Sequence, residues 1–276
     1  MPQLESISIG FPPPLLGNEP RSLNAQLFEN QWVAIEKPSN IGVRPDSSSG
    51  SVVELNLENA LQAQADRALP SLKKYGLSPE YKPKSIYVID PDIHGFGIWA
   101  LNNQSLEELR NAFGSNKLTF EYEFFAKDDP HSGEEFSAYL PIAQHLQQPG
   151  RYIISTRTGK KAETEFRKLR TWPKAQVALW RATTTMPRGH QIRLHAFECG
   201  LEVLGETIYS TTPGVALTDL KKKRVSKRTA ASQPIWTGVN MALSTLRGDV
   251  FPNGEISFAR PRAMNTLIRK LDQFAL

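Results

Sequence analysis

The chain has 276 residues, a formal net charge of +5 and a sequence pI of about 9.2. This length suits one large domain or two small ones, and the basic balance favours a polyanionic partner. A single cysteine, Cys199, excludes an internal disulfide and a multi-cysteine metal site. With no signal-peptide pattern and no apolar run near the ~20 residues of a membrane helix, we expect a cytoplasmic protein without membrane contact.

The first 25 residues are rich in proline, glycine and serine, and residues 12–14 are three prolines that break any helix. They predict an irregular N-terminal arm over residues 1–25. One domain is then expected over residues 26–276.

The first elements of this domain are a strand, a turn and a helix. Residues 32–35 predict a short strand that runs into a turn-rich segment with two cations, Lys37 and Arg44. Apolar residues at helical spacing predict a helix over residues 53–69. The next apolar run, at residues 85–89, predicts a second strand.

A carboxylate stands between this strand and the apolar run at residues 96–101, which predicts another strand. Such an acid, Asp90, must be paired or solvated. Arg193 is the candidate partner, because its N–H groups can match two carboxylate oxygens. Asp92 shares a face with Asp90 if the chain stays extended, so a two-carboxylate glycosidase is an alternative.

The middle of the chain alternates helical and strand patterns. A capping box and a closing glycine predict a helix over residues 105–114. Alternating aromatic and acidic residues at 120–124 predict a half-exposed strand, and residues 138–142 predict a weak one. Residues 151–155 and 162–169 predict the two strands of a hairpin.

The most distinctive stretch follows a predicted strand at residues 177–185. A tight turn leads into a short helix that ends near Gly200. The unpaired N–H groups of a helix start favour anions. Its first turn carries Arg188, His190, Gln191 and Arg193, which predicts an anion-binding site.

The densest charge run contains Lys221, Lys222, Lys223 and Arg224. It fits either a solvated loop or a contact with nucleic acid phosphates. An amphipathic pattern over residues 264–274 predicts a C-terminal helix. Scattered helices among hairpins favour an α+β fold with a mixed, mainly antiparallel sheet.

Residues 187–209 resemble the third motif of the RluA family of RNA pseudouridine synthases. The family pattern is Gly-Arg-Thr-His-Gln-Ile-Arg, a His two residues on and a later Gly-Asp-x-x-Tyr, and this chain reads PRGHQIRLH and GETIY. Residues 36–45 are similar to the family's Asn-Lys-Pro…Val-His-Pro element. Residues 159–164 resemble its Gly-Lys-x-Ala-x-Thr hairpin. The elements keep the family's order over most of residues 27–276.

The resemblance implies the pseudouridine synthase fold, with helices flanking the sheet, and isomerisation of uridine in a structured RNA (rRNA or tRNA). It implies no cofactor or metal, RNA as the partner, and a monomer. Asp90 would be the catalytic carboxylate, with Arg193 beside it and Phe120, or alternatively Tyr122, stacked on the target base. The residues expected to bind RNA are Lys37, Arg44, Arg188, His190, Gln191, Lys221, Lys222, Lys223 and Arg224.

The catalytic element departs from the family pattern. Residues 87–95 read YVIDPDIHG, where the family has His-Arg-Leu-Asp-x-x-Thr-Ser-Gly. The aspartate and the glycine are kept. The family arginine beside the flipped nucleotide is Val88, and the Thr-Ser pair is Ile93 and His94. An inactive RNA-binding homologue of the same fold is therefore the alternative.

Overall fold

The computed structural model describes residues 4–45, 55–67, 75, 77, 80–129, 133–221 and 233–275. The chain forms two compact units. Unit 1 comprises Met1–Thr119, Thr185–Gly189 and Thr245–Phe258, and unit 2 comprises Phe120–Thr184, His190–Ser244 and Ala259–Leu276.

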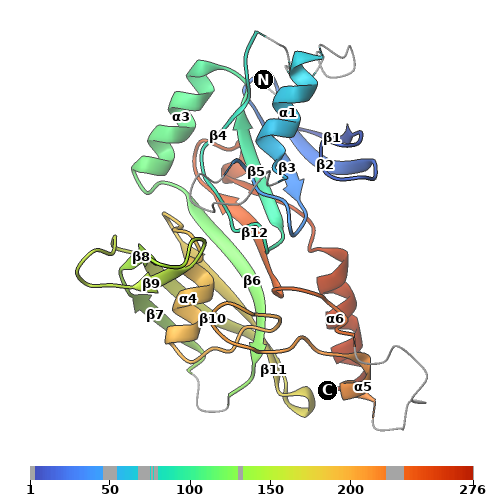
Figure 1. The fold of residues 1–276 in the computed structure, drawn as a ribbon, viewed down its shortest axis with the longest axis vertical. Coiled ribbons are helices and arrows are strands. Elements are labelled where there is room, and N and C mark those ends of the chain that lie inside the picture. The colour runs from blue at the N-terminus through green and yellow to red at the C-terminus, as the bar shows by residue number, and fades with distance from the viewer. Residues whose placement is uncertain are drawn as a thin grey trace. The chain divides into compact units, whose positions relative to one another are not determined.

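Unit 1 contains a five-stranded sheet with the order β1-β2-β3-β5-β4, in which all neighbours are antiparallel (Figure 1). Its strands are β1 (Leu4–Phe11), β2 (Arg21–Phe28), β3 (Trp32–Lys37), β4 (Lys84–Ser85) and β5 (Gly95–Ala100). The predicted strands at residues 32–35 and 96–101 are β3 and β5. Both lie inside the sheet and are almost fully buried, which explains their continuous apolar sequences.

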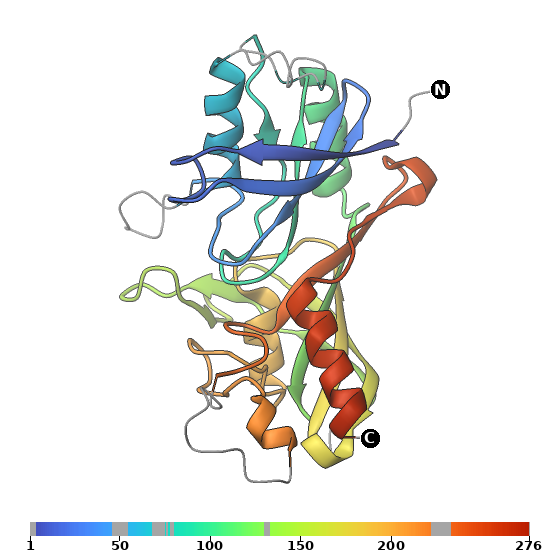
Figure 2. The ribbon, with the colours of Figure 1, turned by 90° about the vertical axis from the view of Figure 1, so that its right-hand side faces the viewer.

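The prediction of an irregular N-terminal arm was wrong, because β1 and β2 pair over eight residues each as an antiparallel hairpin. The three prolines that indicated irregular structure lie in the connection between the two strands. The strand β1 forms one edge of the sheet of unit 1 (Figure 2). The apolar residues Ile9 and Phe11 are buried at its C-terminal end, which anchors the hairpin.

Two helices of unit 1, α1 (Leu57–Asp66) and α3 (Asn103–Gly114), begin at asparagines. Asn56 Oδ1 accepts the N–H of Asn59 at 2.8 Å, and Asn102 Oδ1 accepts the N–H of Ser105 at 2.8 Å. The predicted N-cap at Ser105 is therefore wrong by three residues. Asparagine satisfies the orphan N–H of a first turn as well as serine does.

Unit 2 is built on β6 (Thr119–Lys127), β7 (Glu135–Tyr139), β10 (Glu163–Trp172), β11 (Val177–Thr184) and β12 (Met241–Arg247), in the order β12-β6-β11-β10-β7. From Thr245 on, β12 belongs to unit 1, where it pairs with β13 (Glu255–Ser257). Short helical segments are η1 (Pro173–Ala175), α5 (Leu217–Leu220) and, in unit 1, η2 (Pro252–Gly254). The mainly antiparallel sheets with helices confirm the α+β prediction.

Helices α6 (Arg262–Phe274) and α4 (Gln191–Glu198) contact opposite faces of the unit 2 sheet. Figure 2 shows α6 in red beside the strands. The apolar stripe of α6 packs against the β11 residue Leu179, whereas Gln191 of α4 donates to the side chain of Thr184. Leu179 and Thr184 are an odd number of residues apart on β11, so their side chains point to opposite faces.

The predicted half-exposed strand at residues 120–124 is buried on both faces of β6. Glu121 and Glu123 are 8% and 4% exposed. Arg260 binds Glu123 through Nε and Nη2 at 2.6 and 3.0 Å, and Arg181 approaches Glu123 at 3.5 Å. Ion pairing therefore permits burial of carboxylates that the alternating sequence pattern placed in solvent.

The predicted hairpin of residues 151–155 and 162–169 was also wrong. Strand β9 (Tyr152–Ile154) pairs with β8 (Ile142–Gln144), whereas β10 pairs with β7 and β11. The turn that indicated the hairpin does exist, and a Cβ at Gly159 would collide with the carbonyl of Ser155. The glycine allows this close approach but does not determine which strands pair.

Candidate active site

The candidate catalytic residues form two groups, one in each unit. In unit 1, Asp90 stands half-buried at the start of a turn, where the N–H of Ile93 donates to the Asp90 carbonyl at 3.3 Å. The predicted strand before it was too long, because only Lys84–Ser85 pairs with β5. Tyr87 lies in the part of the predicted strand that does not pair, and it contacts β5 through its side chain instead. The Tyr87 hydroxyl donates to the Phe96 carbonyl at 2.8 Å.

Lys37 supports this turn from the end of β3. Its side chain is 0% exposed, and its ammonium lies against the backbone. The Nζ atom donates to the carbonyl oxygens of Pro38, Ile41, Pro91 and Ile93 at 3.1, 2.9, 3.0 and 2.6 Å. The sequence predicted a contact with RNA for Lys37, and the structure gives its ammonium a role within the protein.

His94 follows the turn, at one of the positions that depart from the family pattern. Burial lowers the pKa of His94, and the charge of Lys37 lowers it further, to about 4. The imidazole is therefore neutral at physiological pH. Val88, at the position of the family arginine, is 39% exposed.

In unit 2, Arg193 is 1% exposed and forms a bidentate ion pair with Glu206. Arg193 Nε lies 2.7 Å from Glu206 Oε2, and Nη2 lies 2.8 Å from Oε1. The same carboxylate accepts the N–H groups of Thr207 and Ile208 at 2.9 and 2.8 Å. Burial raises the pKa of Glu206, but Arg193 and these two N–H groups outweigh it and hold the pKa below its ordinary value.

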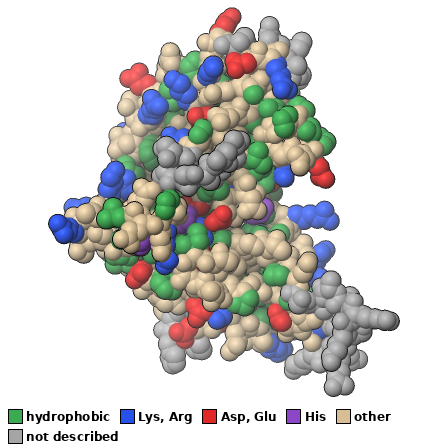
Figure 3. Space-filling view, in the orientation of Figure 1, with side chains coloured by type: hydrophobic (Ala, Val, Ile, Leu, Met, Phe, Trp, Pro, Cys, Tyr) green, Lys and Arg blue, Asp and Glu red, His purple; other side chains and the backbone are tan. Residues whose placement is uncertain are grey.

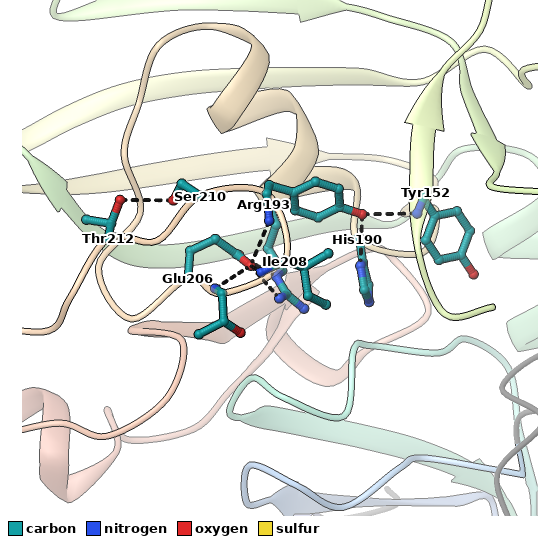
Figure 4. A network of polar contacts seen from close by, with 9 residues as sticks. Tyr152, His190, Arg193, Glu206, Ile208, Ser210 and Thr212 are labelled. Carbon is teal, nitrogen blue, oxygen red and sulfur yellow. Dashed lines mark hydrogen bonds and ion pairs between the residues drawn. The ribbon is translucent and has the colours of Figure 1, made fainter. Parts of the chain in front are cut away.

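The Tyr209 hydroxyl joins the start of α4 to the β8–β9 hairpin, because it contacts both His190 and Tyr152, which are labelled in Figure 4. It accepts the N–H of Tyr152 at 3.2 Å and lies 2.9 Å from His190 Nδ1. The guanidinium carbon of Arg193 also lies over the Tyr209 ring, 5.9 Å from the ring centroid. The loop from Glu206 to Tyr209 therefore orients both the arginine and the histidine of the central motif.

Two further residues of the motif bind the sheet. Gln191 Nε2 donates to the Glu163 carbonyl at 2.7 Å and to the hydroxyls of Thr164 and Thr184, both at 3.0 Å. His195 lies 2.9 Å from the Thr164 hydroxyl and 2.9 Å from the Leu140 carbonyl. Burial lowers the pKa of His195, and its bond to Leu140 opposes this in part. These contacts fix α4 on β10 and β11.

Phe120 and Tyr122 lie on β6, opposite Thr184 and Ala182 of β11. Residues that pair across antiparallel strands point to the same face, so both rings lie on the face that α4 covers. Phe120 is 0% and Tyr122 3% exposed. The stacking of a base on either ring stays a prediction, as does the pairing of Asp90 in unit 1 with Arg193 in unit 2.

The other residues that were predicted to bind RNA differ in their exposure to solvent. Arg44 is exposed, Arg188 and His190 are at least partly buried, and Lys221 lies with its Nζ 5.7 Å from the Phe274 ring centroid. Lys222, Lys223 and Arg224 lie outside the described residues. Lys and Arg side chains alternate with Asp and Glu over the face drawn in Figure 3, so net charge alone does not locate an RNA surface there.

The sequence placed Glu206 and Tyr209 in the third motif, but neither was predicted to be a site residue. A signal existed in the Gly-x-x-x-Tyr spacing of residues 205–209, where an acid follows a glycine with a φ of +76°. That backbone turn presents three successive N–H groups to one carboxylate. Among the described residues, no cluster of His, Cys, Asp and Glu could hold a metal, and no helix has the length and apolarity to cross a membrane.

The family model for RNA pseudouridylate synthase matches residues 31–197, which include Asp90 and Arg193. The chain belongs to the RNA pseudouridylate synthase family. It is 27% identical over 187 residues to an uncharacterized RNA pseudouridine synthase of Aquifex aeolicus, covering 66% of this chain and 55% of that protein. It is 24% identical over 207 residues to ribosomal large subunit pseudouridine synthase D of Zymomonas mobilis, covering 74% and 61%.

Solved structures support the pseudouridylate synthase fold. The structure of human RNA pseudouridylate synthase domain containing 4 matches with a TM-score of 0.63 and 16% identity, covering 88% of this chain and 91% of that chain. Human RNA pseudouridylate synthase domain containing 1 matches with a TM-score of 0.55 and 16% identity, covering 91% and 94%. The predicted fold and family are therefore confirmed.

Proposed function

We propose that this protein is an RNA pseudouridine synthase in which Asp90 is the catalytic carboxylate. The observation that carries the proposal is that Asp90, which resembles the aspartate of the family's catalytic pattern, lies within the matched residues and stands at a turn that a buried lysine supports. The fixed orientation of Arg193 on Glu206 in unit 2 also supports it. An arginine that is already oriented loses less side-chain entropy when it meets a further partner.

The reaction is an isomerisation, so it needs no second substrate. The bond between uracil N1 and the ribose breaks, the base turns, and C5 bonds to the same ribose carbon. C5 loses a proton and N1 gains one. An ionised Asp90 would attack the sugar or the base, or remove a ribose proton. The target uridine must leave the stack, which costs a few kcal/mol, and an aromatic ring such as Phe120 or Tyr122 would offset that cost.

The test is direct. Purified protein is incubated with RNA from cells that lack it, and pseudouridine is mapped along the RNA. New pseudouridine at defined uridines supports the proposal. Specific RNA binding without product would instead support the alternative, an inactive RNA-binding homologue. The valine at position 88, where the family pattern has an arginine, is the observation that favours this alternative.

The finer proposal is that the substrate is rRNA or tRNA and that the enzyme acts as a cytoplasmic monomer. The basic balance of the chain supports an RNA substrate, and the single cysteine supports a reducing compartment such as the cytoplasm. Mapping separate rRNA and tRNA pools identifies the substrate class. Light scattering of the purified protein tests the monomeric state, and fractionation of the source cells tests the cytoplasmic location.

A further inference from the structure

Asn240 is a buried asparagine directly before β12, outside the sequence motifs described above. Its side chain is 0% exposed. The Nδ2 atom donates to the carbonyl oxygens of Trp236 and Gly238 at 3.1 and 2.7 Å. An asparagine amide has two N–H donors, so these two bonds use both of them. The side chain therefore closes the turn that runs from residue 236 to residue 240.

This turn lies against Gly205 of the third motif. A Cβ at Gly205 would collide with the Gly238 carbonyl and would lie 3.1 Å from Asn240 Nδ2. Gly205 has a φ of +76°, which glycine adopts without strain. The main-chain N–H of Asn240 also donates to the Leu204 carbonyl at 2.8 Å. Asn240 thus holds Leu204 with its main chain, and its side chain holds the Gly238 carbonyl against Gly205.

Glu206 directly follows Gly205, so the place of its carboxylate depends on the backbone that Asn240 holds. The carboxylate binds Arg193 Nε and Nη2 at 2.7 and 2.8 Å. Two parallel bonds of this kind fix the plane of a guanidinium as well as its position.

We propose that Asn240 is a positioning residue. By holding the backbone at Gly205, its amide sets the Glu206 carboxylate and thereby the direction of the Arg193 guanidinium. The catalytic consequence rests on the proposed function, whereas the placement of Arg193 does not.

The test compares Asn240→Ala with Asn102→Ala, which removes a partly buried asparagine that caps α3 in unit 1. Both variants lose side-chain hydrogen bonds. Only Asn240→Ala should accelerate hydrogen exchange at Arg193 Nε and at the Ile208 amide, because both of these N–H groups bind Glu206. If Asn240 only stabilised its own turn, the two N–H groups would stay protected, and that result would overturn the proposal.

Kinetics give a second measurement. At saturating RNA, Asn240→Ala should lower kcat roughly 10-fold or more, since a misplacement of about 1 Å costs up to about 100-fold. The Kd for RNA should stay within about twofold, because a buried amide loses no phosphate contact. Asn102→Ala should change neither quantity. Normal kcat in folded Asn240→Ala would overturn the proposal, as would a weaker Kd with normal kcat.

Asn240→Leu separates hydrogen bonding from packing. Leucine has nearly the same branched shape but no N–H group, so the carbonyls of Trp236 and Gly238 lose their donors. It should therefore expose the Arg193 Nε–H to exchange as Asn240→Ala does. A protected Arg193 Nε–H in Asn240→Leu would show that side-chain volume holds the turn, which would overturn the role of the amide.

A measurement on the wild-type protein decides the case if the Asn240 variants do not fold. Hydrogen exchange is followed at Asn240 Nδ2, Arg193 Nε and the Ile208 amide in increasing urea below the unfolding transition. All three should exchange with one free energy of opening and one urea dependence, as groups that open together do. Opening of Arg193 Nε at a different free energy from Asn240 Nδ2 would overturn the proposal. If the wild-type protein makes no pseudouridine, the proposed function fails, whereas exchange still decides the role of Asn240.

Discussion

Arg193 and Glu206 form a buried bidentate ion pair, with Nε–Oε2 and Nη2–Oε1 distances of 2.7 and 2.8 Å. Both side chains are almost fully excluded from water, at 0% and 2% exposure. Backbone N–H groups of the following loop bind the same carboxylate. The pair therefore fixes one edge of the guanidinium before any substrate arrives.

We expect Glu206→Gln to destabilise the protein strongly, because it leaves the charge of Arg193 buried without its carboxylate. Breaking a buried pair costs about 3–5 kcal/mol, which urea unfolding would measure. The matched control is Glu202→Gln, since Glu202 pairs with Lys127 at the surface and should lose less than about 1 kcal/mol. Equal losses in the two variants would contradict a dominant role for the buried pair.

The Tyr209 hydroxyl should hold the β8–β9 hairpin to α4. Tyr209→Phe keeps the ring in its apolar cluster with Leu194 and Ile142 but leaves the Tyr152 N–H without its acceptor. We expect a loss of about 1–3 kcal/mol and faster amide exchange at Tyr152. Tyr139→Phe is the control, because it removes a hydroxyl from a residue that is 68% exposed. It should change neither the free energy of unfolding nor the amide exchange at Tyr152. Normal exchange at Tyr152 in Tyr209→Phe would refute this link.

Periodicity and turn signals predicted the elements whose packing is local. The stripe from Met264 to Phe274 follows directly from helical spacing, because α6 buries one continuous face. The apolar run of β11 follows from the burial of both faces at the start of that strand. It was harder to predict from the sequence which strands pair with one another. Gly159 marks a turn, yet the strand that pairs with β9 is β8, whose sequence contains no signal for that choice.

Polar partners were the least predictable. Lys37 and Arg193 both have sequence contexts typical of anion binding, but burial and nearby acceptors decide their contacts. The acceptors of Lys37 include carbonyls more than 50 residues away, at Pro91 and Ile93. A carbonyl has no sequence signature, because every residue carries one. The sequence therefore located the motifs and could not distinguish a lysine that binds RNA from one that binds the backbone.

The two histidines with lowered pKa values make stability fall in mild acid. Burial holds the pKa of His94 at about 4 and lowers that of His195, so the unfolded chain binds protons that the folded chain rejects. Their contribution to the free energy of unfolding is fully present above pH 6.5 and is lost as the pH falls from 6.5 toward 4. We expect urea unfolding to show this slope. His94→Gln should flatten it, and Lys37→Met should reduce it by raising the His94 pKa. A slope that His94→Gln leaves unchanged would contradict the assignment.

Asp90→Asn separates enzyme from binder. It keeps the shape of the side chain and removes the charge, so we expect product to vanish while the Kd for RNA changes less than about twofold. Asp92→Asn is the matched control, because Asp92 lies in the same turn and is half-buried like Asp90. Product from Asp90→Asn would remove the proposed role of this carboxylate. Loss of product in Asp92→Asn alone would move the role to its neighbour.

Val88→Arg restores the arginine that the family pattern has beside the flipped nucleotide. Val88 is 39% exposed, so a longer charged side chain fits there at little cost to the core. If the substitution at this position weakened an otherwise functional enzyme, kcat at saturating RNA should rise several-fold. Added charge alone would also tighten binding to RNA, so Val88→Lys is the control.

The two variants are compared at equal salt and at saturating RNA, where affinity no longer affects the rate. Arginine offers a planar fork that can bind or stack on a nucleotide, and lysine offers only a point charge. A rise in kcat with Val88→Arg and not with Val88→Lys would assign the defect to the missing guanidinium. An equal gain in affinity with no change in kcat in either variant would instead show that Val88 does not limit the reaction.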